Sequence, residues 1–435
     1  MKRLLITLLA LIVLIPAAII VWQLKDADDD TSTTTVPAAT SSPADAARLL
    51  ETGRYLARAG DCMACHTARS GKEYAGGRAV PTPFGTIYTP NITSDEQTGI
   101  GKWNAGDFWR ALHHGKSKDG SFLYPAFPFT EYTKISRGDS DALFAYMKTV
   151  APVAQANREN ALRFPYNQRI LLAFWRALYF RPGVFQPDTK QSMDWNRGAY
   201  LVQGLGHCAA CHTTRNALGA TSSYAPLAGG LIPVLNWYAP SLTSDAEAGL
   251  GNWELQSIHD LLRTGVSTRS TVFGPMAEVV GASLQYLSDS DIKAMALYLK
   301  SLPQNERAPV IETPQPSERE AERIMASGAI LYKNNCAECH KASGAGIPLA
   351  YPPLSGNRAI TMGSAINPIR IVLNGGFPPT TTGNPRPYGM PPFSQLLSDQ
   401  EIADVVSYIR NSWENKAGYV SPAEVNRSRA VPLDD

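Results

Sequence analysis

The hydrophobic and polar positions divide the chain into an apolar N-terminal stretch, a polar stretch and three similar amphipathic regions. Leu4 to Leu24 form an uncharged, mostly apolar run behind Lys2 and Arg3. At 1.5 Å per residue, a helix over this run reaches about 31 Å, roughly the hydrocarbon thickness of a bilayer. The pattern predicts an inner-membrane anchor over residues 1–24, with a cleaved signal peptide as the alternative, and it places the rest of the chain in the periplasm.

The remainder of the chain carries a helical pattern. Residues 25–46 are acidic and then rich in Ser, Thr, Pro and Ala, which predicts a flexible linker. Amphipathic helices, each preceded by a Ser or Asp cap, are predicted at residues 140–150, 288–302 and 398–413. No alternating strand pattern of any length competes with them, so the sequence predicts an all-α protein.

These helices close three segments that also begin alike. Each segment opens with a helical pattern that contains a glycine and an aromatic residue: Gly53-Arg-Tyr-Leu, Gly198-Ala-Tyr-Leu and Gly328-Ala-Ile-Leu-Tyr. Such internal repeats indicate tandem units. We predict three helical domains at residues 47–153, 191–303 and 319–416, with inter-domain linkers at 154–190 and 304–318 and a polar tail at 417–435.

Each domain carries one C-x-x-C-H motif, and the three motifs use all six cysteines of the chain. They are Cys62-Met-Ala-Cys65-His66, Cys208-Ala-Ala-Cys211-His212 and Cys336-Ala-Glu-Cys339-His340. The spacing is typical of haem c attachment, because two thiols so placed can bond to the two vinyl groups on one porphyrin edge. The histidine that follows then supplies the proximal nitrogen to iron. We predict three covalently bound haem c groups.

Other interpretations of the cysteines fit less well. A redox dithiol does not require a histidine after the second cysteine in all three copies. A tetrahedral zinc site needs four ligands, and only two cysteines and one histidine recur in each domain. Disulfides are plausible in an exported chain, but freely chosen spacings would not repeat as C-x-x-C.

Composition and charge remove a further class of partner. Lysine and arginine exceed aspartate and glutamate by only two, and charged residues make up 18% of the chain. A surface that is so nearly balanced is not basic enough to make nucleic acid an expected partner.

Methionines suit the open side of the second and third haems. Small cytochromes of this kind usually take a methionine sulfur from a loop before the last helix, and Met276 and Met390 stand at that place. Thioether ligation raises the reduction potential, which suits an electron acceptor. Met295 and Met362 are the alternatives, and Met295 is expected to be a core residue of its amphipathic helix.

The first domain departs from this pattern, since Phe127 stands where a methionine is expected. Met147 is expected to pack in the core, and Met63 lies inside the attachment motif. The first haem is therefore predicted to be five-coordinate, or bis-His through His113 or His114; the alternative is that these two histidines are ordinary polar residues.

The chain resembles the three-haem cytochrome c subunit of membrane-bound bacterial dehydrogenases that oxidise alcohols, aldehydes, sugars or sugar acids. The resemblance extends over residues 47–416 and rests on the stretches that lead into Cys62, on Leu123-Tyr-Pro-Ala, Asn196-Arg-Gly-Ala-Tyr-Leu201, Gly206-His-Cys-Ala-Ala-Cys-His212, Gly274-Pro-Met276-Ala-Glu-Val-Val280, Asn384-Pro-Arg-Pro-Tyr-Gly-Met390 and Ser407-Tyr-Ile-Arg-Asn-Ser-Trp413. It implies three tandem class I cytochrome c domains after an N-terminal membrane helix.

The resemblance also implies a function. The chain would accept electrons from a separate catalytic subunit, which holds pyrroloquinoline quinone, flavin or a molybdenum cofactor, and pass them to ubiquinone or a terminal oxidase. Phe127 occupies a position that is methionine in the alcohol dehydrogenase branch of this family. Phenylalanine at that position is more typical of cytochromes that are paired with molybdenum enzymes. The predicted anchor is also N-terminal, whereas the alcohol dehydrogenase subunit is usually held through its C-terminal part.

Two other functions remain as alternatives. A peroxidase-like multihaem enzyme would use an open first haem, and a stand-alone electron shuttle would have no catalytic subunit. No substrate-binding catalytic site is evident in the sequence. The apolar, aromatic segment at 164–180 is too short to span a bilayer; it predicts either a helix that packs the first two domains together or an interfacial helix near the membrane or a quinone.

Overall fold

The computed structural model of the chain describes residues 14–24, 42–245, 248–304 and 315–431. The fold separates into two compact units. The first comprises the residues up to Asp188 together with Tyr200–His207 and Ala217–Ala220, and the second comprises Thr189–Ala199, Cys208–Asn216 and the chain from Thr221 onward. The first unit holds the first C-x-x-C-H motif, and the second unit holds the other two.

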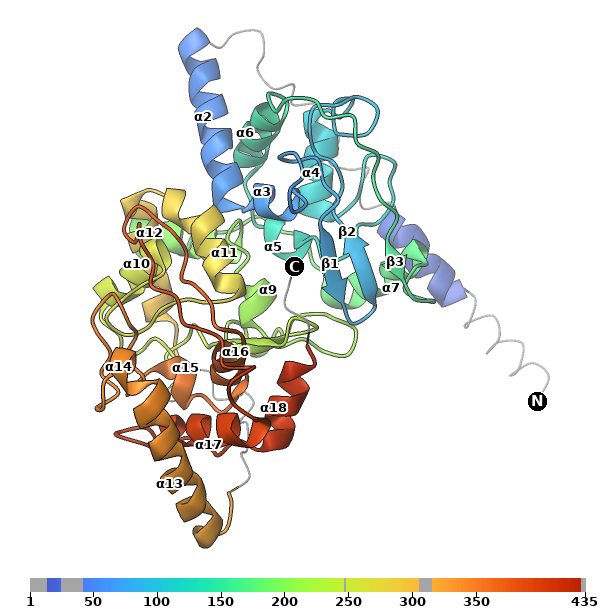
Figure 1. Cartoon of the computed structure of the whole chain (residues 1–435). Helices are drawn as coiled ribbons and strands as arrows, with labels where there is room; N and C mark the ends of the chain where they lie inside the picture. The colour runs from blue at the N-terminus through green and yellow to red at the C-terminus, as the bar shows by residue number, and fades with distance from the viewer. Residues whose placement is uncertain (1–13, 25–41, 246–247, 305–314, 432–435) are drawn as a thin grey trace, which may run out of the picture. The chain divides into compact units, whose positions relative to one another are not determined.

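Each motif follows a long helix that crosses the last helix of the same repeat. The three pairs are α2 (Pro43–Ala59) with α6 (Arg137–Met147), α8 (Met193–Gln203) with α12 (Asp289–Ser301), and α13 (Glu318–Asn335) with α17 (Asp399–Arg410). Figure 1 shows α2 beside α6 and α13 beside α17. The closing helices begin after the caps Ser136, Ser288 and Ser398, each of which accepts a backbone N–H three residues on.

A glycine lies at each helix crossing, which explains why it recurs in the sequence. A Cβ atom on Gly53 would lie 1.9 Å from the carbonyl oxygen of Ala142, and one on Gly198 would lie 2.0 Å from that of Ala294. The same atom on Gly328 would lie 2.5 Å from the carbonyl oxygen of Asp404. The backbones therefore approach so closely that no side chain fits between them.

Shorter helices surround these pairs. The first unit adds α3 (Cys62–Cys65), α4 (Ala105–His114), α5 (Phe129–Tyr132), the 3-10 helix η1 (Arg169–Leu171) and α7 (Leu172–Tyr179). The second adds α9 (Ala209–His212), α10 (Leu255–Thr264), α11 (Pro275–Ala282), the 3-10 helix η2 (Leu284–Tyr286), α14 (Ala337–His340), α15 (Arg358–Thr361), α16 (Ile366–Asn374) and α18 (Pro422–Arg429).

The prediction of an all-α fold is wrong, because each unit contains a small antiparallel sheet. In the first, β1 (Ala79–Thr82) pairs with β2 (Gly85–Tyr88), which pairs with β3 (Ala161–Leu162). In the second, β4 (Gly230–Ile232) pairs with β5 (Trp237–Ala239). These strands have two to four residues, which is too short for a period of two to appear in the sequence.

The predicted N-terminal membrane helix is not found either. Residues 14–24 are helical, and residues 1–13 of the predicted 1–24 anchor lie outside the described part of the chain. Within the described ranges, no helix combines the length and the apolar character that crossing a bilayer requires. Of the predicted linker at 25–46, only 42–46 is described, and it caps and opens α2 through Ser42.

Two segments outside the three predicted domains also form helices. The predicted polar tail contains α18, which packs on α17 and buries Val425. The apolar segment at 164–180 forms η1 and α7, and the latter packs on the first domain through Trp175, whose ring centroid lies 6.2 Å from that of Phe129. Its Arg176 is buried and donates a hydrogen bond to the carbonyl oxygen of His114.

Candidate haem sites

Each C-x-x-C-H motif folds into a single helical turn. The backbone N–H of the histidine donates to the carbonyl oxygen of the first cysteine at 2.9 Å in all three copies: His66 to Cys62, His212 to Cys208 and His340 to Cys336. Residues three apart in such a turn lie on one face, so the two thiols of each motif are presented together. None of the six cysteines forms a disulfide.

The three predicted proximal histidines share one orientation. In each, the ring Nδ1 donates to a proline carbonyl oxygen: Pro90 at 2.8 Å from His66, Pro240 at 2.7 Å from His212, and Pro352 at 3.0 Å from His340. A carbonyl only accepts hydrogen bonds, so Nδ1 carries the proton and Nε2 keeps its lone pair. In metalloproteins, a histidine that binds a metal through one ring nitrogen is commonly oriented by a hydrogen bond from its other ring nitrogen in this way.

Burial keeps these groups in their neutral forms. It lowers the pKa of His212 to about 4, where the charge of Arg358 lowers it further while the hydrogen bond to Pro240 opposes the shift. It also lowers the pKa of His66 and His340. Burial is likewise the main cause that raises the pKa of the Cys62 thiol to about 12. Neutral imidazole is the form that ligates metal.

These residues fit a covalently bound haem at each site. Two thiols on one face of a helical turn are followed at once by a neutral imidazole whose outer nitrogen is oriented by a backbone carbonyl. Histidine as the proximal ligand and two cysteines as attachment points are the donor set that c-type haem requires.

The predicted distal methionines lie between the attachment motif and the closing helix of their domains, Met390 on a loop and Met276 in a short helix. Met390 exchanges two backbone hydrogen bonds with Gly376, at 2.8 and 3.0 Å, and its side chain packs against the same core of the third domain as Cys336. Met276 lies in the first turn of α11, after Gly274 at a φ of +56°. A Cβ atom on Gly274 would lie 2.6 Å from the Trp237 ring. The indole of Trp237 therefore packs directly against the backbone that leads into Met276.

The other methionines that the sequence analysis considered as iron ligands have packing partners. Met295 and Met147 are each 1% exposed, and Met362 is also buried, all in helical cores. Met63 is half-buried beside Arg58. Buried positions of this kind are consistent with packing roles for Met147, Met295 and Met362.

In the first domain, the residues that could replace a methionine have packing partners. Phe127 is half-buried and contacts Tyr132, with ring centroids 5.2 Å apart. The His113 ring stacks on Trp109 at 4.3 Å, and its Nδ1 lies 3.3 Å from the Thr133 hydroxyl. The contacts of His113 are those of an ordinary polar residue, and the sixth ligand of the first haem stays a prediction.

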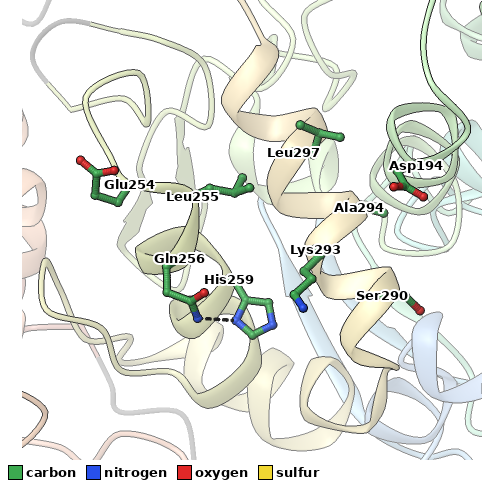
Figure 2. A pocket seen from close by; sticks show the side chains of 9 residues that line it. All are labelled: Asp194, Glu254, Leu255, Gln256, His259, Ser290, Lys293, Ala294 and Leu297. Carbon is green, nitrogen blue, oxygen red and sulfur yellow. Dashed lines mark hydrogen bonds between the residues drawn. The ribbon is translucent and has the colours of Figure 1, made fainter.

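A separate pocket of about 550 Å³ lies in the second domain. Figure 2 shows its lining on α10 and α12, with Asp194 from α8 at the side. His259 is held there by hydrogen bonds to Gln256 at 3.2 Å and to Asp289 at 2.9 Å. The lining contains no haem-attaching cysteine and no predicted iron ligand, so this pocket is distinct from the haem sites.

The loop that carries the proximal proline is held by residues that sequence reasoning missed. In the first domain Asn160 accepts a hydrogen bond from the Tyr88 N–H at 2.9 Å, and Asn157 accepts one from Asn91 at 2.6 Å. In the second, Asn367 accepts from the Tyr238 N–H at 2.9 Å, and Arg358 donates to the Ser241 carbonyl at 2.9 Å. The repeat between Asn91–Trp103 and Ser241–Trp253 marks the loop itself, but nothing local in the sequence marks these partners.

Three attachment turns on small helical domains define a multihaem c-type cytochrome. The chain belongs to the cytochrome c family, whose model matches residues 50–151, 196–303 and 325–413. It carries three covalently bound haem c groups, at the cysteine pairs 62/65, 208/211 and 336/339, and functions in electron transfer.

Curated relatives of similar length are cytochrome subunits of dehydrogenases. The cytochrome c subunit of a quinone-type alcohol dehydrogenase from Gluconacetobacter polyoxogenes is 41% identical over 88% of this chain and 84% of its own length. The gluconate 2-dehydrogenase cytochrome c subunit of Pantoea cypripedii is 42% identical over 85% and 86%. A nicotinate dehydrogenase subunit of Pseudomonas putida is 40% identical over 87% of this chain, which matches 32% of that longer protein.

Proposed function

We propose that this chain is the three-haem electron-transfer subunit of a dehydrogenase complex, and that it passes electrons from a catalytic subunit to ubiquinone or a terminal oxidase. The observation that carries the proposal is the recurrence of one proximal arrangement, with a neutral imidazole oriented by a proline carbonyl, in three domains. The similarity to cytochrome subunits of dehydrogenases supports the catalytic partner.

In this proposal the chain's residues hold three redox centres and tune them. Bound haem supplies one-electron chemistry between ferric and ferrous iron. Cys62, Cys65, Cys208, Cys211, Cys336 and Cys339 attach the groups, and His66, His212 and His340 are the proximal ligands. Met276 and Met390 are the distal ligands of the second and third haems, while Phe127 leaves the first haem without a methionine.

The partner's cofactor is proposed to be pyrroloquinoline quinone, flavin or a molybdenum centre. The similarity to an alcohol dehydrogenase of the quinone type supports the first, and the similarity to a nicotinate dehydrogenase subunit supports a partner that acts on a heterocycle. We also propose that the haem domains are exported to the periplasm, because Lys2 and Arg3 ahead of an apolar run form an export pattern.

Purification of the tagged full-length chain from its native host tests the partnership. A dehydrogenase subunit is expected to co-purify, and ethanol, gluconate or nicotinate added under anaerobic conditions is expected to reduce the haem c absorbance. Isolation of the chain without a dehydrogenase, with no substrate-dependent reduction, would contradict the proposal. Rapid peroxide turnover by the purified chain would instead favour the peroxidase-like alternative.

The distal ligands have their own spectroscopic test. Ferric haem with a methionine ligand shows a weak charge-transfer band, and its intensity relative to total haem is expected to correspond to two of the three haems. Met276→Leu and Met390→Leu should each remove half of that band. Met295→Leu and Met362→Leu are matched controls that should leave it unchanged, and a band that corresponds to three haems would refute the assignment of Phe127.

A further inference from the structure

Arg358 of the third domain is buried in the proximal loop of the second. It begins α15 directly after Asn357, whose side chain caps that helix by accepting from Ala359 N–H at 3.0 Å. The guanidinium donates to the carbonyl oxygen of Ser241 at 2.9 Å and to that of Ala248 at 3.4 Å. It also lies 5.1 Å from the Trp253 ring centroid, and the whole residue is 9% exposed.

The Arg358 guanidinium contacts neutral groups. Carbonyl dipoles and an indole face surround it, and among the described residues no carboxylate lies within 4 Å of its nitrogens. Burial lowers the pKa of Arg358 to about 10, so the side chain stays charged at neutral pH. A buried cation without a carboxylate partner acts over a longer range than an exposed one, because less water screens it.

This charge acts on the second haem site. Ser241, which accepts from Arg358, follows Pro240, whose carbonyl oxygen orients His212 at 2.7 Å. The guanidinium therefore donates to the carbonyl of Ser241, the residue next to Pro240, and Pro240 positions the predicted proximal ligand His212.

We propose that Arg358 sets the reduction potential of the second haem, so that a residue of the third domain tunes a redox centre of the second. Reduction adds one electron to the iron and removes one positive charge from the site, while no bond is formed or broken. A fixed cation nearby opposes the ferric state and favours the ferrous state. The inference rests on the proposed ligation by His212.

The first domain provides an internal contrast. Its corresponding loop is bonded by a neutral amide, Asn157, which donates to the carbonyl oxygen of Thr98 at 3.1 Å and accepts from the Asn91 N–H at 2.6 Å. This amide comes from the segment that follows the first domain's own last helix. Arg158 of the same segment lies 3.8 Å from the Tyr88 ring centroid, but its side chain is exposed to water. A buried cation that donates to the loop carbonyls therefore distinguishes the second domain from the first.

A spectroelectrochemical titration of the purified full-length chain tests the proposal. The wild type should titrate as three one-electron components, and in Arg358→Met one component should move to lower potential. For the loss of one partly screened unit charge, the ferrous-to-ferric ratio at fixed potential should fall by on the order of tenfold, which is about 59 mV for one electron. Arg358→Lys, which keeps the charge, should stay within about threefold of the wild type.

Asn367→Ala is the matched control, because Asn367 also bonds the second domain's loop from the third domain but carries no charge. It should lower stability and move the second component by less than Arg358→Met does. An equal fall in Arg358→Met, Arg358→Lys and Asn367→Ala would show a structural effect and overturn the proposal, as would three unchanged components in Arg358→Met. If Arg358→Met loses haem, Arg358→Gln replaces it.

Haem content separates this test from that of the ligand assignment. Alkaline pyridine spectra should give three haem c groups per chain in the variants used. A wrong assignment of His212 would appear as a His212→Ala variant that keeps all three potentials, whereas a wrong role for Arg358 would leave that variant shifted and Arg358→Met unshifted.

Discussion

The first and second domains share the loop that carries the proximal proline carbonyl, but they close it with residues from different places. In the first domain, residues 153–160 return to the loop, and the Asn160 side chain accepts from the Tyr88 N–H. In the second, the same position, Tyr238, exchanges hydrogen bonds at 2.9 and 2.8 Å with Asn367 of the third domain. In both domains an asparagine side chain accepts a hydrogen bond from the tyrosine N–H. That asparagine follows the first domain directly in the chain, whereas for the second domain it belongs to the third domain.

This difference separates a haem domain that is closed by the segment directly after it from one that needs a neighbouring domain. The third domain resembles the first, because Asn415 beyond its own last helix binds Gly356 N–H at 2.8 Å and the Leu354 carbonyl oxygen at 2.9 Å. Among the described residues, only the second domain's loop is closed by a separate domain. Sequence repeats thus report a common backbone, while the residues that complete each site follow from how the repeats are joined.

The largest expected effect concerns what the domains share. Gly53→Ala and Gly198→Ala should each destabilise the protein by about 2–3 kcal/mol, because the added Cβ meets a backbone carbonyl that cannot move without separating the helices. Gly328→Ala should cost less, since its Cβ position is 2.5 Å from the carbonyl oxygen of Asp404 rather than about 2 Å. Denaturant unfolding, followed by circular dichroism, measures the three values.

Gly138→Ala provides the control for these substitutions. Gly138 lies in α6 with no other atom within 4 Å of a Cβ built on it, so alanine there should be neutral or slightly stabilising. A Gly53→Ala variant as stable as Gly138→Ala would show that the helices can separate without cost.

The parts of this structure that the sequence predicted are those that depend on neighbours within a few residues. The C-x-x-C-H turn is local, so its chemistry follows from spacing alone. The recurrent glycine was visible as part of the repeat, but its place at the helix crossings is known only from the structure. The sheets were missed because β4 and β5 have three residues each, and their pairing depends on tertiary contacts instead of on an alternating pattern.

The partners of the proximal loops could not be predicted for a different reason. Arg358 and Asn367 stand more than 110 residues from the loop that they complete, and neither belongs to a repeated motif. The boundaries of the closing helices were also displaced: α6 begins at Arg137, whereas the sequence suggested 140, because Ser136 rather than a later residue caps it. Met276 and Met390 stay predictions as distal ligands.

The second largest expected effect concerns the two asparagines that bond the proximal loops, Asn160 for the first domain and Asn367 for the second. Asn367→Ala should cost about 1–2 kcal/mol, since it removes two hydrogen bonds, and Asn160→Ala about 1 kcal/mol for one. Hydrogen exchange read by mass spectrometry should locate each loss. Exchange should accelerate in β4 and β5 for Asn367→Ala, and in β1 and β2 for Asn160→Ala.

The two variants serve as controls for each other. If Asn367→Ala leaves the β4–β5 hairpin as protected as in the wild type, the second domain does not depend on the third for this loop. Faster exchange in both hairpins for either single variant would instead indicate a global loss of stability.

The smallest effect concerns pH and Asp95, a carboxylate that holds a hydroxyl in the first domain's loop and has no such partner at the corresponding described position of the second. Asp95 accepts from the Thr98 N–H at 2.7 Å and from its hydroxyl at 2.8 Å, and that hydroxyl accepts from the Gln155 N–H at 3.1 Å. Alanine stands at the corresponding place in the second domain, where Asp245 accepts from the Ala248 N–H at 3.0 Å.

The hydrogen bonds from Thr98 lower the pKa of Asp95 below its ordinary value of 3.8. A group whose pKa is lower in the folded state stabilises the fold above its unfolded pKa, and this contribution is lost as pH falls through the folded pKa. Between pH 5 and pH 3, hydrogen exchange corrected for intrinsic rates should therefore accelerate more at residues 89–99 than at β5 of the second domain. Asp95→Asn should show the faster exchange already at neutral pH and lose the pH dependence. Equal acceleration in both regions would mean that this carboxylate does not distinguish the two domains.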